Sequence, residues 1–162
     1  MQEKIPSEFP FRSQAQIWAF GRFGQGGWIT ISNANSRTRV QLPPALFDVL
    51  AILMRAAKQV SSSEDWVPSG FLSAANLCRE LKLHSRDTPN PLLPDLEHVT
   101  KYIYRLRKVF AKAMNPRVSA KNWARSMLEW VPFLGYRLST PPQNLHLAIL
   151  KDPKDKEGDA LL

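Results

Sequence analysis

Positive charge without any negative charge marks one stretch of this sequence. From His98 to Leu128 the chain contains lysines and arginines but no aspartate or glutamate. The basic residues of this stretch are Lys101, Arg105, Arg107, Lys108, Lys112, Arg117, Lys121 and Arg125. The rest of the chain has equal numbers of basic and acidic residues, so this stretch accounts for the whole net charge of +8. A local excess of that kind is typical of a surface that binds a polyanion.

The first part of the basic stretch, HVTKYIYRLRKVFAKA, has the periodicity of an amphipathic helix. At about 100° per residue, one set of apolar side chains shares a face, namely Val99, Ile103, Leu106, Phe110 and Ala113. Basic residues follow the same spacing on the opposite face, namely Lys101, Arg105, Lys108 and Lys112, with Thr100, Tyr104 and Arg107 beside them. A solvated helix usually mixes acidic with basic residues, because like charges one turn apart are mildly destabilising. The all-positive face therefore favours nucleic-acid binding over a merely solvated surface.

Short strands and a glycine-rich turn precede this helix in the sequence. Apolar-rich segments predict an N-terminal antiparallel meander with strands at Ile17–Phe23, Trp28–Ser32 and Arg39–Leu42. The segment GRFGQGG lacks the Gly-Lys-Ser/Thr of a phosphate-binding loop. We therefore expect it to form a hairpin turn.

Two further helices and a hairpin complete the predicted scaffold. Pro44 is suitably placed to open a helix, and Ser73 to cap a second one that ends near Leu81. The basic helix is expected to begin near Leu96–Val99, after a proline-rich loop. The segment SMLEWVPFLGYRLS predicts two strands around a turn, with four side chains available to pack, namely Leu128, Trp130, Tyr136 and Leu138. The order of sheet, helices and hairpin indicates an α+β fold.

Sequence patterns for catalysis, metal binding and membrane insertion are missing. The three histidines are far apart, and one cysteine, Cys78, makes neither an internal disulfide nor a common thiolate zinc site. We expect Cys78 to be buried in a helix. No apolar run approaches the roughly 18 residues of a membrane span, and the N-terminus lacks the apolar core of a signal peptide. We therefore expect a cytoplasmic protein that is not an enzyme, with no cofactor, no metal and no membrane partner.

Four segments, in order, carry a resemblance to a known family. LPPALFDVLAIL, SAANL, HVTKYIYRLRKVF and LEWVPFLGYRLS resemble the OmpR/PhoB-type winged-helix DNA-binding domain of bacterial response regulators. The resemblance covers residues 17–139, leaving an N-terminal extension at 1–16 and a C-terminal tail at 140–162. It implies a winged helix-turn-helix with an N-terminal antiparallel sheet, a three-helix bundle and a C-terminal β-hairpin wing. It further implies a transcription regulator whose third helix enters the major groove of double-stranded DNA.

The resemblance also indicates which residues contact DNA. Arg105 and Arg107 occupy family-like contact positions, and Lys101 and Tyr104 face bases or the adjoining backbone. Arginine pairs bidentately with guanine, whereas lysine supplies charge to phosphates. Lys121 and Arg125, in a connection longer than the family's, are expected to reach phosphates. The full expected DNA-binding set is Thr100, Lys101, Tyr104, Arg105, Arg107, Lys108, Lys112, Lys121 and Arg125.

Departures from the family pattern leave alternatives open. Pro132 and Phe133 stand where the family's wing commonly has Arg and Gly. No segment offers the acidic pocket and lysine of a phosphate-accepting receiver domain, so we expect none. Binding as a homodimer or as tandem copies on repeated half-sites follows from the resemblance, and a protein partner that supplies the signal is left open. The competing hypotheses are a winged-helix protein-interaction module and a non-specific DNA-binding accessory protein. For residues 145–150, a strand, a docking peptide and an unordered segment all stay open.

Overall fold

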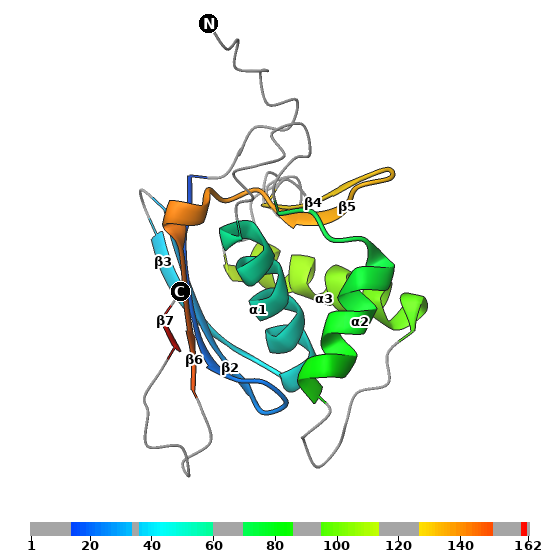
Figure 1. Ribbon diagram of the computed structural model, residues 1–162. Coiled ribbons are helices and arrows are strands. Elements are labelled where there is room, and N and C mark those ends of the chain that lie inside the picture. Colours follow the sequence, from blue (N-terminus) through cyan, green and yellow to red (C-terminus); the bar gives the residue numbers. More distant parts are fainter. Residues whose placement is uncertain are drawn as a thin grey trace, which may run out of the picture.

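The computed structural model describes residues 14–33, 36–59, 70–85, 95–113, 127–150 and 160–161. Within these ranges an N-terminal sheet is followed by helices and then by a hairpin, which confirms the predicted α+β class (Figure 1). The elements are β1 (Gln16–Arg22), β2 (Gly26–Asn33), β3 (Ser36–Leu42), α1 (Pro44–Lys58), α2 (Ala74–Ser85), α3 (Leu96–Ala113), β4 (Leu128–Val131), β5 (Gly135–Leu138), a 3-10 turn η1 (Pro142–Asn144), β6 (Leu145–Ile149) and β7 (Ala160–Leu161).

The first strands form the meander that the sequence predicts. β1 pairs antiparallel with β2, and β2 pairs antiparallel with β3. Along β1 the side chains of Ile17 and Ala19 are buried, while those of Trp18 and Phe20 are exposed. This alternation is typical of a sheet that covers a core with one face only. The glycine-rich segment forms the β1–β2 turn, as expected, and Gly24 there has a φ of 79°, a conformation that favours glycine.

A strand from the C-terminal segment completes the same sheet. β6 lies parallel to β1, with Leu145 opposite Ile17, and β7 pairs antiparallel with β6. The side chains of Leu145, Leu147 and Ile149 are buried. Of the alternatives that the sequence left open for this segment, the structure therefore shows a strand. The folded unit extends past the boundary that the resemblance indicates.

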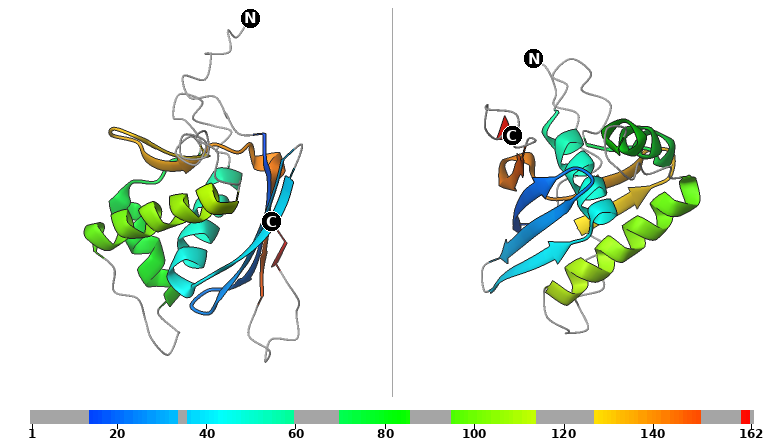
Figure 2. Two further views of the ribbon diagram at one scale, coloured as in Figure 1. Left: turned by 180° about the vertical axis from the view of Figure 1, so that it is seen from behind. Right: turned by 90° about the horizontal axis from the view of Figure 1, so that it is seen from below.

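The described helices lie on one side of the sheet (Figures 1 and 2). α1 begins at Pro44, as predicted, and packs on β2, α2 and α3. The hydroxyl oxygen of Ser73 accepts a hydrogen bond from the N–H of Asn76 at 3.1 Å, which confirms the expected cap of α2. α2 runs to Ser85, one turn beyond the end that the sequence indicates. The sheet thus has one face covered by helices and one face turned away from them.

The β4–β5 hairpin is anchored to the rest of the fold. Leu72, just before α2, exchanges two backbone hydrogen bonds with Tyr136 of β5, at 2.9 and 2.8 Å. Across the hairpin, the buried Arg137 donates from Nε to Oε1 of Glu129 at 2.6 Å. The packing prediction for Trp130 is wrong, because its side chain is 55% exposed. The β4–β5 hairpin, to which Trp130 belongs, extends away from the five-stranded sheet (Figure 1).

Two further predictions concern the helices. Cys78 is buried in α2, as expected. Among the described residues, none of the helices combines the length and the apolar composition that crossing a membrane requires. The described helices instead use their apolar faces to build the common core.

Candidate nucleic-acid interface

A buried stripe fixes the orientation of α3. All the side chains that the periodicity assigned to the core are buried, namely Val99, Ile103, Leu106, Phe110 and Ala113. Through them α3 packs on α1 and α2. The hydroxyl of Thr38 in β3 donates a hydrogen bond to the carbonyl oxygen of Ala113 at 2.8 Å, which ties the end of α3 to the sheet. The opposite face of α3 is therefore turned outward along its whole length.

The first turn of α3 is closed by a reciprocal cap between Asp95 and His98. Oδ1 of Asp95 accepts a hydrogen bond from the backbone N–H of His98 at 2.9 Å. In return, the backbone N–H of Asp95 lies 3.4 Å from Nδ1 of His98. The backbone hydrogen bond is the main reason that the pKa of Asp95 lies below its usual value. A carboxylate at this end also interacts favourably with the helix dipole, so the start of α3 is well defined.

The outward residues of α3 form a surface that we call the α3 face. It consists of the exposed residues Thr100, Lys101, Tyr104, Arg105, Lys108 and Lys112. Nζ of Lys101 lies 3.3 Å from Oε1 of Glu97, an exposed ion pair that contributes little. Nζ of Lys108 lies 4.6 Å from the centroid of the Tyr104 ring, a cation–π contact. Within the described ranges, no acidic side chain pairs with Arg105, Lys108 or Lys112, so the α3 face stays positively charged.

Arg107 has a different place from the rest of the predicted set. Its side chain is half-buried, and Nε and Nη2 both donate to the carbonyl oxygen of Leu128, at 3.0 and 2.7 Å. The guanidinium therefore joins α3 to the first residue of β4. This contact assigns Arg107 to positioning the hairpin rather than to the outward surface. Sequence spacing placed Arg107 beside the basic face, because spacing does not show that β4 of the hairpin lies next to this side chain.

The hairpin tip and the long connection before it complete the predicted set. Lys121 and Arg125 lie outside the described residues. Pro132 and Phe133 form the exposed turn between β4 and β5. Phe133 has a φ of 69° and a fully exposed side chain. The hairpin tip thus presents an exposed apolar ring.

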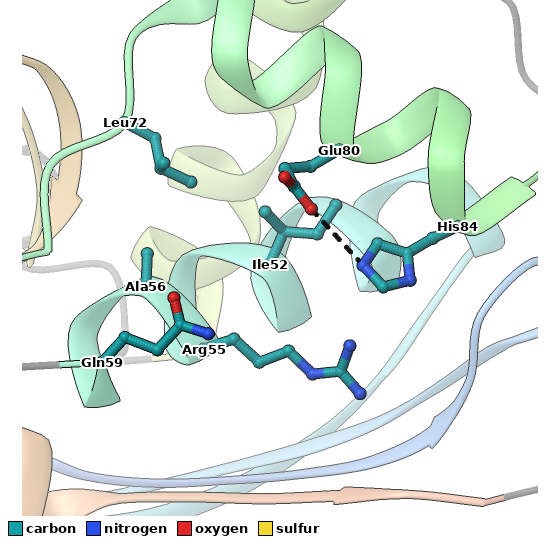
Figure 3. Close-up of a pocket in the computed structure, with 7 residues that line it drawn as sticks. All are labelled: Ile52, Arg55, Ala56, Gln59, Leu72, Glu80 and His84. Atoms are coloured by element: carbon teal, nitrogen blue, oxygen red, sulfur yellow. Dashed lines mark ion pairs between the residues drawn. The ribbon is translucent and has the colours of Figure 1, made fainter.

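A pocket between α1 and α2 is a second candidate site (Figure 3). Its volume is about 180 Å³, below the roughly 300 Å³ at which ligand pockets usually begin. The lining residues are Ile52, Arg55, Ala56, Gln59, Leu72, Glu80 and His84. Among the described residues, no group of three potential metal ligands forms. The pocket therefore offers little room for a ligand and no metal-binding cluster in the part of the chain described.

The charged groups of the pocket hold the β1–β2 turn against the helices. The ring of His84 stacks on that of Phe23 with centroids 4.1 Å apart, and the guanidinium of Arg55 lies 4.9 Å from the same ring centroid. Nε2 of His84 also lies 3.7 Å from Oε2 of Glu80. Burial lowers the pKa of both Arg55 and His84. These contacts assign the pocket to packing of the turn.

The outer face of the sheet is a surface that the sequence predictions did not include. It presents three exposed aromatic side chains, those of Trp18, Phe20 and Trp28. Arg37 and Arg39 of β3 lie beside two of these rings. The signal was the period of two in IWAFGR and SRTRVQ, which alternates buried with outward residues.

Relatives supply no independent assignment of these surfaces. Comparisons of the chain with protein-family models, with curated proteins and with solved structures find no match. The charge, exposure and anchoring of the α3 face, the hairpin and the outer sheet face must therefore carry the functional argument.

Proposed function

We propose that this protein binds double-stranded DNA in a sequence-specific manner and regulates transcription. In this proposal it is a winged helix-turn-helix protein of the OmpR/PhoB type, with α3 in the major groove and the β4–β5 hairpin as the wing. The observation that carries the proposal is the α3 face, which is positively charged along a helix whose other side is core. Such a regulator would act in the cytoplasm, as a homodimer or as tandem copies on repeated half-sites, and receive its signal from a protein partner.

The positions of the basic residues suggest a division of labour. Arg105 is exposed in the middle of α3, and no acidic side chain of the described residues pairs with it. Its guanidinium is thus available to pair bidentately with a guanine edge. Lys112 lies two turns later, where a helix that enters the groove with its N-terminal half leaves it again. Its ammonium group would meet a phosphate, which adds affinity without sequence preference.

The hairpin supports the same geometry. It extends away from the sheet on the same side as α3 (Figures 1 and 2). Arg107 fixes the base of the hairpin to α3 through the carbonyl oxygen of Leu128. A helix in the major groove would therefore bring the hairpin to the neighbouring backbone or groove. Loss of Arg107 should change the angle between helix and wing rather than remove a DNA contact.

One observation favours a protein-interaction module as the second candidate. Trp130 and Phe133 place exposed aromatic side chains on the outer part of the hairpin. Exposed apolar groups are typical of protein contacts, and Pro132, beside Phe133, stands where a DNA-contacting arginine is common in the family. In that case the α3 face would contribute charge to a protein interface instead of entering DNA.

Selection of bound fragments from random duplex DNA, followed by a salt series, tests the proposal. We expect an enriched sequence, and a log affinity that falls linearly with log salt as counterions are released. Arg105→Ala should weaken the cognate duplex by about 1–3 kcal/mol and relax the preference at one base pair. Lys112→Ala should weaken cognate and random duplexes equally and reduce the salt slope by about one unit.

Arg22→Ala is the matched control, since it removes the same charge from β1 rather than from α3. It should leave duplex affinity within the error of the measurement. Duplex affinity that is unchanged between low and physiological salt would reject the proposal and favour the interaction module. Equal losses on cognate and random duplexes for Arg105→Ala would instead indicate the non-specific accessory protein.

A further inference from the structure

The outer face of the five-stranded sheet has an ordered arrangement of aromatic and basic side chains. Trp18 and Phe20 of β1 point outward, and Phe20 lies directly opposite Trp28 of β2 in the strand register. Trp18, Phe20 and Trp28 are 38%, 46% and 38% exposed. Such large rings are normally buried in a core or an interface. Three of them together, on the face away from the described helices, mark a candidate binding surface.

Arginines from the edge strand lie over this aromatic surface. The guanidinium carbon of Arg39 lies 4.4 Å from the centroid of the Trp28 ring, and that of Arg37 lies 5.8 Å from the Trp18 ring. Both arginines are exposed. Within the described part of the chain, no acidic side chain forms an ion pair with either of them. A guanidinium stacked on a ring keeps its N–H edge for an anion.

A chain of polar contacts orients the opposite side of the platform. The ring of His146 in β6 stacks on Trp18, with centroids 5.2 Å apart and an interplanar angle of 18°. Nε2 of His146 lies 3.0 Å from Oε1 of Gln16, and Nε2 of Gln16 donates to Oδ1 of Asn144 at 2.9 Å. The His146 ring is thereby held parallel to its neighbour, so the platform is largely preformed. A preformed site loses less entropy when a ligand binds.

The alternation of the strands keeps negative charge away from this face. The outward positions of β1, β2 and β3 that flank the rings carry Thr30, Ser32 and Gln41 besides the arginines. None of these described positions carries a carboxylate. Flat rings, unpaired arginine charge and neutral hydrogen-bonding groups match one chemistry, a polyanion that also carries flat π-systems. Unpaired nucleotides have both properties, whereas the bases of a duplex are already stacked on each other.

We propose that the outer sheet face binds single-stranded nucleic acid. Bases stack on Trp18, Phe20 and Trp28, and phosphates pair with Arg37 and Arg39. Sheets with outward aromatic rings bind unpaired bases in this manner, and the contribution of such stacking tolerates any base sequence. From β3 to β6 the face spans three strand spacings, about 14 Å, enough for only a few nucleotides. This site is separate from the α3 face and does not depend on the duplex proposal.

Titration of a fluorescent oligo(dT) of about 15 nucleotides, at low and at physiological salt, tests the inference. The full chain should bind it and show quenching of tryptophan fluorescence. The double variant Trp18→Ala, Trp28→Ala should bind at least about 5-fold more weakly per ring lost, the lower end of what base stacking contributes. Trp18→Phe should retain most of the affinity, because it keeps a stacking ring. Arg39→Gln should reduce the salt slope by about 0.7, the value for one phosphate of a single strand.

Trp130→Ala is the control, since it removes an exposed tryptophan from the hairpin rather than from the sheet. It should leave oligo(dT) binding unchanged. Thermal melting of every variant separates loss of a contact from loss of the fold. No binding by the full chain at low salt would overturn the inference, and so would binding that ignores Trp18 and Trp28. Poly-glutamate that binds more tightly than oligo(dT), with the same tryptophan dependence, would also overturn it in favour of an acidic protein. Duplex affinity of the same variants is a separate readout, so either proposal can fail alone.

Discussion

The buried carboxyl group of Asp48 in α1 makes stability depend on pH in a direction opposite to that of most acids. Its side chain has no exposed surface. Both carboxylate oxygens accept from the N–H of Gly24 in the β1–β2 turn, at 3.1 and 3.2 Å. Desolvation raises the pKa of Asp48 from 3.8 to about 7, although the Gly24 hydrogen bond acts in the other direction. Between these two pH values the native state therefore holds a proton that the unfolded chain has released.

The sign and size of the effect follow from that difference. Because the pKa is higher in the folded state, stability is greatest at low pH and falls as the pH rises from about 3.8 to about 7. A difference of about three pKa units corresponds to about 4 kcal/mol. Asp48→Asn keeps an oxygen acceptor for Gly24 but cannot ionise. The N–H groups of its buried amide have no acceptor provided for them, which lowers stability by about 1–3 kcal/mol.

We therefore expect the effect of Asp48→Asn on the free energy of unfolding to change sign as the pH rises through this range. The variant should be about 1–3 kcal/mol less stable than the parent near pH 4 and about 1–3 kcal/mol more stable near pH 8. Urea unfolding followed by tryptophan fluorescence at several pH values measures the difference. Asp95→Asn is the control, because the pKa of Asp95 is lowered and the residue is exposed. Its effect should not vary over this range, since Asp95 titrates below it. An equal effect of Asp48→Asn at all pH values would refute the argument.

Substitutions in and beside the hairpin test its anchoring and its turn, with one control on α3. Arg107→Ala should cost about 1–3 kcal/mol in urea unfolding, because it leaves a carbonyl oxygen at the base of β4 without its charged donor; Lys112→Ala, on the exposed face of the same helix, should cost less than about 0.5 kcal/mol. Gly135→Ala should lower stability by about 2–4 kcal/mol, because the residue has a φ of 103° and a Cβ there would overlap the carbonyl oxygen of Leu72. A cost below 0.5 kcal/mol would contradict that contact. Phe133→Gly should raise the thermal midpoint slightly, because it relieves a positive φ at a side chain that packs on nothing described.

Short sequence patterns predicted the elements whose formation depends on residues near one another in the chain. The core stripe of α3 followed from spacing alone, because a helix at the surface of a fold buries one face and exposes the other. Pro44 and Ser73 marked helix starts. Proline lacks the backbone N–H that the first helical turn leaves unpaired, and the serine hydroxyl accepts a hydrogen bond from such an N–H. The glycine-rich turn followed from the conformations that only glycine adopts easily. In these cases the information lies within a few residues.

Predictions that needed distant contacts were incomplete. β6 pairs parallel with β1, although the helices and the hairpin separate residues 17 and 145 in the sequence. Its sequence, NLHLAIL, alternates too loosely to specify a strand alone. Arg107 was grouped with the outward basic residues because its spacing does not show that Leu128 returns to it. Trp130 was expected to pack because it lies two residues after Leu128 in the same strand, and that spacing does not show where the strand leaves the core.

The outer sheet face shows why charge counted along a chain differs from charge on a surface. Outside His98–Leu128, basic and acidic residues are equal in number, so the sequence offered no excess at Arg37 or Arg39. The acids that balance them in the count lie elsewhere; Glu129, for example, pairs with Arg137 in the β4–β5 hairpin. Opposite charges on different faces are largely screened from each other over about 10 Å of salt solution. A polyanion that approaches the sheet therefore meets arginine without compensation, although the sequence around it is neutral on average.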